Sequence, residues 1–198
     1  MRKLSVDDVI PLDDYLRVRD EMRNRVRAER ARRRVPVGDR VSLHFENRDT
    51  VLFQIEEMIR VETIRDPEKL AEEVRVYNDL IAGEGELRAT FFVEITERER
   101  IREDLDSLIG LESQGLYLVV GGERVAAEFE PGHAREDRIS AVHFVRFQLT
   151  PGQRRAFAGG DPPVEIEIDH PGYRARTTLA DDTRAALAED LGETVATR

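Results

Sequence analysis

The chain has 198 residues, of which 40% are hydrophobic and 36% are charged, and its formal net charge is −10. It contains no cysteine, which excludes disulfides, thiolate nucleophiles, cysteine-ligated zinc and protein-held iron–sulfur clusters. No apolar run approaches the ~20 residues of a membrane-spanning helix, and the first residues lack the apolar core of a signal peptide, so we expect a cytoplasmic protein with no membrane partner.

The first predicted element is a long helix over residues 11–34. Pro11 followed by Asp13 and Asp14 suits a first helical turn, and Pro36 predicts where the helix has ended. Its apolar positions form a narrow stripe that consists of Tyr15, Val18, Met22 and Val26. Because such a stripe is typical of a coiled-coil seam, this helix can form an arm of the domain.

The same helix concentrates basic charge. From Arg17 to Arg34 there are nine arginines and three acidic residues, a net charge of +6 that leaves −16 for the rest of the chain. A basic segment on an acidic body favours self-association or an acidic protein partner. The residues that we expect to contact this partner are Arg19, Arg23, Arg27 and Arg30. Nucleic acid is a weaker alternative, because the acidic body would repel phosphates and Tyr15 is the helix's only aromatic residue.

The remaining pattern alternates between strand and helix signals. Strands are predicted over 40–46, 87–95, 115–120, 124–129, 139–149, 164–168 and 174–178. Helices are predicted after Asn47 or Asp49, after Asp66, over 96–108, from Pro151 and over 181–191. Regular strand–helix–strand units do not repeat, which argues against a doubly wound parallel sheet. We therefore predict one α+β domain over 1–198, with a mainly antiparallel, curved sheet flanked by helices.

Polar residues around the second predicted helix form the candidate metal site. The candidate ligands are His44, Glu46, Glu57 and Glu62. Imidazole and carboxylate groups of this kind bind iron, manganese or zinc. The opposing interpretation is a set of surface ion pairs with Arg48 and Arg60, and the Glu-x-x-His signature of di-iron bundles is absent from the sequence.

Other catalytic patterns do not occur in the sequence. It has no His-Glu-x-x-His segment, no nucleophile elbow and no phosphate-binding glycine loop. His143 and His170 lie in phase with the apolar residues of their predicted strands, which is typical of core histidines. The sequence therefore leaves open whether the protein is an enzyme.

Several segments together carry a resemblance to a known family. They are Arg33-Arg34-Val35-Pro36-Val37-Gly38, Phe45-Glu46-Asn47-Arg48-Asp49-Thr50, Gln54-Ile55-Glu56-Glu57-Met58-Ile59-Arg60-Val61-Glu62, Tyr77-Asn78-Asp79-Leu80-Ile81, Ala89-Thr90 and His170-Pro171-Gly172-Tyr173. In these the chain resembles an uncharacterised bacterial family, domain-of-unknown-function family 3501, over nearly its whole length. The resemblance implies a redox setting, because genes of such proteins lie near those for rubrerythrin-like di-iron proteins and for iron–sulfur proteins that resemble heterodisulfide reductase subunits.

Two functional hypotheses follow from these observations. The first is a non-enzymatic accessory or protein-binding module, whose partner is a redox protein or a second copy of the chain. The alternative is a small metal-binding protein or metalloenzyme that uses His44, Glu46, Glu57 and Glu62.

Overall fold

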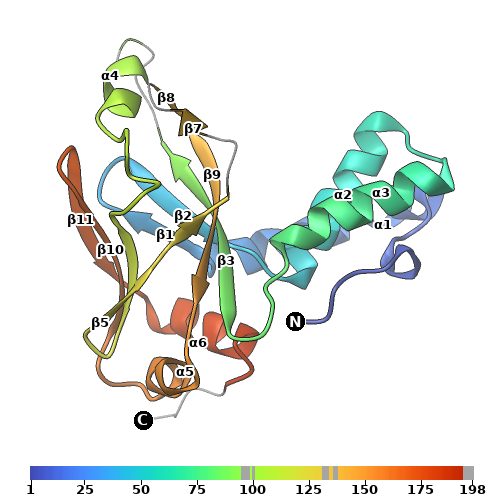
Figure 1. Ribbon diagram of the computed structural model, residues 1–198. Coiled ribbons are helices and arrows are strands. Elements are labelled where there is room, and N and C mark those ends of the chain that lie inside the picture. The colour runs from blue at the N-terminus through green and yellow to red at the C-terminus, as the bar shows by residue number, and fades with distance from the viewer. Residues whose placement is uncertain (95–98, 100, 131–133, 136–137, 194–198) are drawn as a thin grey trace.

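The computed structural model describes residues 1–94, 99, 101–130, 134–135 and 138–193. A unit of helices lies beside two β-sheets that pack face to face (Figure 1). The predicted α+β fold is confirmed, and all the strand pairs in the described part of the chain are antiparallel. The strands divide between two main sheets.

The helical unit has its own buried core. Its elements are η1 (Val6–Asp8), α1 (Leu12–Ala31), α2 (Arg48–Glu62), α3 (Pro67–Tyr77) and η2 (Asn78–Leu80). Asn47 caps α2 by accepting from the Thr50 backbone N–H, and Asp66 caps α3 in the same way through Glu68 and Lys69. Residues of the predicted stripe on α1, Tyr15 and Val26 among them, pack against the apolar face of α2.

The first helix ends three residues earlier than predicted. It ends at Ala31, and residues Arg34–Val37 form strand β1 at the edge of the first sheet. Pro36 is tolerated there because an edge strand leaves one row of backbone groups unpaired. The turn that brings the chain from α1 into β1 buries Arg33, whose guanidinium binds Glu29 and Asp190.

The first sheet has the strand order β1-β2-β3-β9-β6, and the second has the order β11-β10-β4-β5. The remaining bounds in the first sheet are β2 (Val41–Phe45), β3 (Glu86–Val93), β9 (Val142–Gln148) and β6 (Glu128–Phe129). Those in the second sheet are β11 (Tyr173–Thr178), β10 (Val164–His170), β4 (Leu116–Val120) and β5 (Glu123–Ala126). Strands β7 (Ala134–Arg135) and β8 (Arg138–Ile139) pair separately. Helices α5 (Pro151–Ala158) and α6 (Asp181–Asp190) lie at one end of the sheets, and α4 (Ile101–Asp106) lies at the other (Figure 1).

Strand alternation divides the first sheet into an inner and an outer face. Leu43, Phe91 and Val145 point into the large core between the sheets. The sheets are also joined by Tyr173 of β11, whose hydroxyl donates to the Val37 carbonyl at 2.7 Å. The outer face is left to meet the helical unit.

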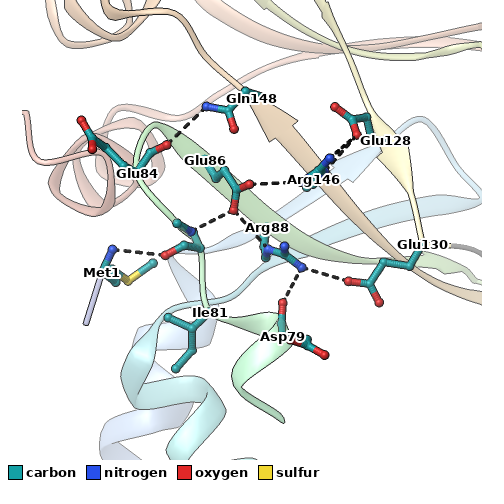
Figure 2. A network of polar contacts seen from close by, with 12 residues as sticks. Met1, Asp79, Ile81, Glu84, Glu86, Arg88, Glu128, Glu130, Arg146 and Gln148 are labelled. Carbon is teal, nitrogen blue, oxygen red and sulfur yellow. Dashed lines mark hydrogen bonds and ion pairs between the residues drawn. The ribbon is translucent and has the colours of Figure 1, made fainter. Parts of the chain in front are cut away.

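The two parts are tied together at more than one place. In addition to Arg33, a polar network joins β3 to the segment that follows η2 (Figure 2). The Glu86 carboxylate accepts from the Gly83 backbone N–H at 2.8 Å, and Arg88 donates to the Asp79 carbonyl. This network fixes the position of the helices relative to the first sheet, while the assignment of residues 1–198 to one domain stays a prediction.

Candidate functional site

A cavity of about 260 Å³ opens between the helical unit and the outer face of the first sheet. Its lining includes Arg30, His44, Glu46, Gln54, Phe92 and Phe144, and we call it the Glu46 cavity. Further hollows adjoin it at Arg30, Gln54 and Phe144 and continue along α1, α2, α3 and η2. Together they form what we call the junction groove.

The strand register assembles the floor of the Glu46 cavity. His44 on β2 lies beside Thr90 on β3, and Thr90 lies beside Phe144 on β9. One step along the same face, Phe92 lies beside Val142. Because residues two apart point to the same face of a strand, these side chains cover the cavity from below, while α1 and α2 supply its other wall.

Glu46 follows β2 directly and has an unusual set of partners. Its side chain accepts from the Thr50 hydroxyl at 2.6 Å, the Gln54 amide at 3.1 Å and the Thr90 hydroxyl at 3.2 Å. The residue is only 8% exposed, and no arginine, lysine or histidine in the described part of the chain forms an ion pair with it. Buried carboxylates are normally paired with a cation, so the environment of Glu46 departs from the usual pattern.

Glu57 is one turn of helix away from Gln54 and has the opposite environment. Its carboxylate receives two bonds from Arg19 at 2.7 and 2.9 Å, two from Arg60 at 3.1 Å and one from the Tyr15 hydroxyl at 2.7 Å. The hydrogen bonds from Arg19, followed by those from Arg60 and Tyr15, hold the pKa of Glu57 well below its usual range. The ion-pair interpretation of the sequence therefore describes Glu57 correctly, although its main partner is Arg19.

The four predicted metal ligands do not come together. His44 and Glu46 line the same cavity, Glu57 faces α1, and Glu62 is exposed at the end of α2. Across the ranges described above, no three His, Asp or Glu side chains gather as ligands for one metal ion.

His44 is half-buried and contributes an uncharged ring to the cavity. Its Nε2 lies 3.1 Å from the Ser42 hydroxyl, and its ring packs on Phe92 with 4.7 Å between the centroids. Burial, followed by the positive charge of Arg34, lowers the pKa of His44. The neutral imidazole is therefore the main form at pH 7.

The four arginines predicted to contact a partner have different roles. Arg19 is committed to Glu57, and Arg23 binds Asp20 on its own helix at 3.1 Å. Arg27 and Arg30 are exposed and have no ion-pair partner in the part of the chain that the structure describes. Arg30 lies over the Phe53 ring, with its guanidinium carbon 5.6 Å from the centroid, so the free positive charge stands at the mouth of the Glu46 cavity.

The network in Figure 2 lies at the other end of the junction groove. Arg88 binds Glu130 at 2.9 Å, and Arg146 binds Glu128 and, at 3.3 Å, Glu86. These charges neutralise one another across β3, β9 and β6. We therefore assign the network a structural role in holding the sheet and the helices together.

Several residues of the cavity had no signal in the sequence as site residues. Gln54 and Thr90 occur only in the segments that carry the family resemblance, and Phe92 and Phe144 lie off the apolar phase of their strands. An aromatic residue on the polar face of a strand is the one signal that indicates a covered outer face. It does not indicate what covers that face.

Comparison with known proteins agrees with this picture of the fold. Residues 3–191 match the family described as "Protein of unknown function (DUF3501)". A crystal structure of a protein of unknown function from Burkholderia pseudomallei K96243 superposes with a TM-score of 0.88 at 33% identity, covering 96% of this chain and 100% of that chain. No curated protein matches the chain. None of the helices described is both long and apolar enough to cross a membrane. From the match over residues 3–191, the chain belongs to the DUF3501 family.

Proposed function

We propose that the protein is a non-enzymatic accessory module that binds a partner protein along the junction groove. The observation that carries the proposal is the surface of this groove, where exposed apolar side chains lie next to arginines that have no ion-pair partner among the described residues. Val61 on α2 is 66% exposed and Val76 on α3 is 51% exposed, and both line the groove. Exposed apolar residues gathered in a hollow are typical of a protein-binding surface.

The charges along the groove indicate the kind of segment that fits. Its α1 side carries Arg27 and Arg30 without ion-pair partners in the described ranges, and the hollow toward η2 is lined by Glu73 and Asp79. The positive charge at α1 and the negative charge near η2 would attract and orient a partner segment whose acidic residues face α1. We therefore propose an acidic partner segment, and the family resemblance favours a rubrerythrin-like or iron–sulfur redox protein as its source.

Affinity purification from the native host tests this proposal. The protein with Val61→Asp and Val76→Asp is compared with the wild type at low salt, and retained proteins are identified by mass spectrometry. Leu16→Asp is the matched control, because Leu16 is 54% exposed on α1 and lies outside the groove. We expect a redox protein to be retained by the wild type and the control and lost from the groove variant.

Two results would contradict the proposal. One is retention of the same proteins by all three forms, which would place the contact elsewhere. The other is that no di-iron or iron–sulfur protein is retained by the wild type at low salt, where attraction between opposite charges is least screened.

The metal-binding alternative keeps one supporting observation, which is that His44 and Glu46 line the same cavity. Metal analysis of protein purified without chelators or a histidine tag tests it. Stoichiometric iron, manganese or zinc that is lost on His44→Ala would favour a metalloprotein over the accessory module.

A further inference from the structure

We propose that the Glu46 cavity is a binding site for a free basic amino acid, a small molecule of the lysine or arginine class. In this site the Glu46 carboxylate would receive the ligand's side-chain cation, and Arg30 would receive its α-carboxylate. The inference is separate from partner docking, because it concerns a small ligand inside the cavity and not a polypeptide along the groove.

Glu46 has no counter-charge in the part of the chain that the structure describes. A buried carboxylate loses the solvation that it has in water, and hydrogen bonds from uncharged groups replace only part of it. Here the three donors, Thr50, Gln54 and Thr90, are all uncharged. An ammonium or guanidinium group entering the cavity would supply the charge that the chain itself does not.

The oxygens of Glu46 and Gln54 can accept more hydrogen bonds than they receive from the described residues. A carboxylate offers about four acceptor positions, and three bonds are formed here, the one from Thr90 to Oε1 being the longest. The Gln54 side-chain oxygen also accepts no hydrogen bond from the part of the chain described. These oxygens match a ligand group that has several N–H donors, as ammonium and guanidinium do.

The walls of the cavity are compatible with an organic cation. Phe92 and Phe144 line the cavity, and aromatic rings attract cations through their faces as well as packing against methylene groups. His44 does not oppose a cation, because burial keeps the pKa of its ring low and the ring uncharged. Arg33 also lines the cavity, but its charge is neutralised by Glu29 and Asp190.

The positions of Glu46 and Arg30 and the volume of the cavity indicate the polarity and the size of the ligand. Glu46 is buried, whereas Arg30 is exposed at the mouth and has no acidic partner among the residues described. The complementary molecule therefore has its cation at one end and its anion at the other, joined by an apolar stem. At about 260 Å³ the cavity is smaller than sites for drug-sized ligands, which suits a molecule of amino-acid size.

Titration calorimetry with L-lysine and L-arginine tests the assignment. Cadaverine and agmatine, which lack only the α-carboxylate, serve as matched probes. For the wild type we expect saturable 1:1 binding of at least one amino acid, and weaker binding of its decarboxylated counterpart. Glu46→Gln keeps the shape of the side chain. It should weaken binding of the amino acid and of its decarboxylated counterpart about 10- to 100-fold, as expected for loss of a charged hydrogen-bond partner.

Arg30 and Arg27 form a matched pair for the second half of the test. Arg30→Gln should remove the preference for the amino acid over its decarboxylated counterpart. Arg27→Gln changes an equally exposed arginine that does not line the Glu46 cavity and should leave binding unchanged. Both arginines are on the surface, so these variants report on the ligand even if Glu46→Gln were to fold poorly.

Three outcomes would overturn the assignment. They are undetectable binding of both amino acids at about 10 mM, binding that Glu46→Gln leaves unaltered, and stoichiometric metal in the cavity in place of an organic cation. The first two outcomes do not bear on the groove variants at Val61 and Val76, so failure of this inference is distinguishable from failure of partner docking. Stoichiometric metal would instead favour the metalloprotein alternative.

Discussion

Glu57 lies within α2, and Glu46 lies just before this helix begins. The two glutamates have opposite electrostatic environments. Glu57 is surrounded by Arg19, Arg60 and Tyr15, so its charge is cancelled within the chain. Glu46 is more deeply buried and has only uncharged partners. A carboxylate whose charge is balanced internally stabilises the fold, whereas one left unbalanced beside a cavity is available to a ligand.

The largest expected effect comes from breaking the Glu57 cluster. Glu57→Gln leaves Arg19 and Arg60 without their anion at the α1–α2 contact. We expect the free energy of unfolding at pH 7 to fall by about 2 kcal/mol, because the site is partly shielded from solvent. Urea denaturation followed by circular dichroism measures it. Glu62→Gln, on an exposed residue of the same helix, is the control and should change stability by less than about 0.5 kcal/mol.

The pH dependence of the Glu57 cluster follows from the same contacts. Since the folded-state pKa of Glu57 is depressed, its contribution is fully present above the ordinary pKa of a glutamate and is lost as the pH falls below it. The loss of stability of the wild type between pH 5 and pH 3 should therefore be smaller in Glu57→Gln. An equal loss in both proteins would contradict the role given to this cluster.

Glu56 gives a smaller effect of opposite sign. It is fully buried, its Oε1 accepts from the Ile10 backbone N–H at 2.7 Å, and its Oε2 has no hydrogen-bond partner among the residues that the structure describes. Burial raises the pKa of Glu56 to about 7. Because the folded state holds this proton more tightly than the unfolded state, stability should fall as the pH rises from about 4.5 to 7. Glu56→Gln should remove this pH-dependent change, which urea denaturation at each pH over that interval measures.

The smallest expected effect is on stability at Glu46. Glu46→Gln removes a buried charge that has no ion-pair partner in the described part of the chain. An amide oxygen at the Oε2 position can still accept from Thr50 and Gln54, and the amide N–H group can donate to the Thr90 hydroxyl. We expect the free energy of unfolding to change by less than about 1 kcal/mol, with either no loss or a small gain. A loss as large as that of Glu57→Gln, measured by the same urea denaturation, would remove the distinction between the two sites.

The sequence predicts helices with clear local signals better than it predicts which segments pair in the sheets. The start of α3 at Asp66 and the apolar spacing in α2 and α3 are local signals, and the structure agrees with them. Of the two predicted caps of α2, Asn47 and Asp49, the structure uses Asn47. Strand β1 was not predicted, because Pro36 reads as a helix end and not as an edge strand. Strand β9 begins at Val142, three residues later than the predicted strand.

Only part of the candidate site could be predicted, because its residues come from segments that are far apart in the sequence. His44 and Glu46 are two residues apart and were singled out together. The rest of the cavity comes from α1, β3 and β9, and pairings over such separations are set by tertiary packing. Likewise, the spacing of Glu57 places it on a helix face, but only the fold shows that Arg19 reaches this face from α1.

The measurement that tests the account most directly is the thermal stability of the wild type and of Glu46→Gln, each with and without 10 mM L-lysine or L-arginine (a ligand that binds only the folded state raises its stability in proportion to RT ln(1 + [L]/Kd)). We predict that the two proteins unfold at similar temperatures without ligand, and that an amino acid raises the Tm of the wild type alone. An equal rise in both proteins, or no rise in either, would contradict the claim that the unbalanced charge of Glu46 is there to bind a cation.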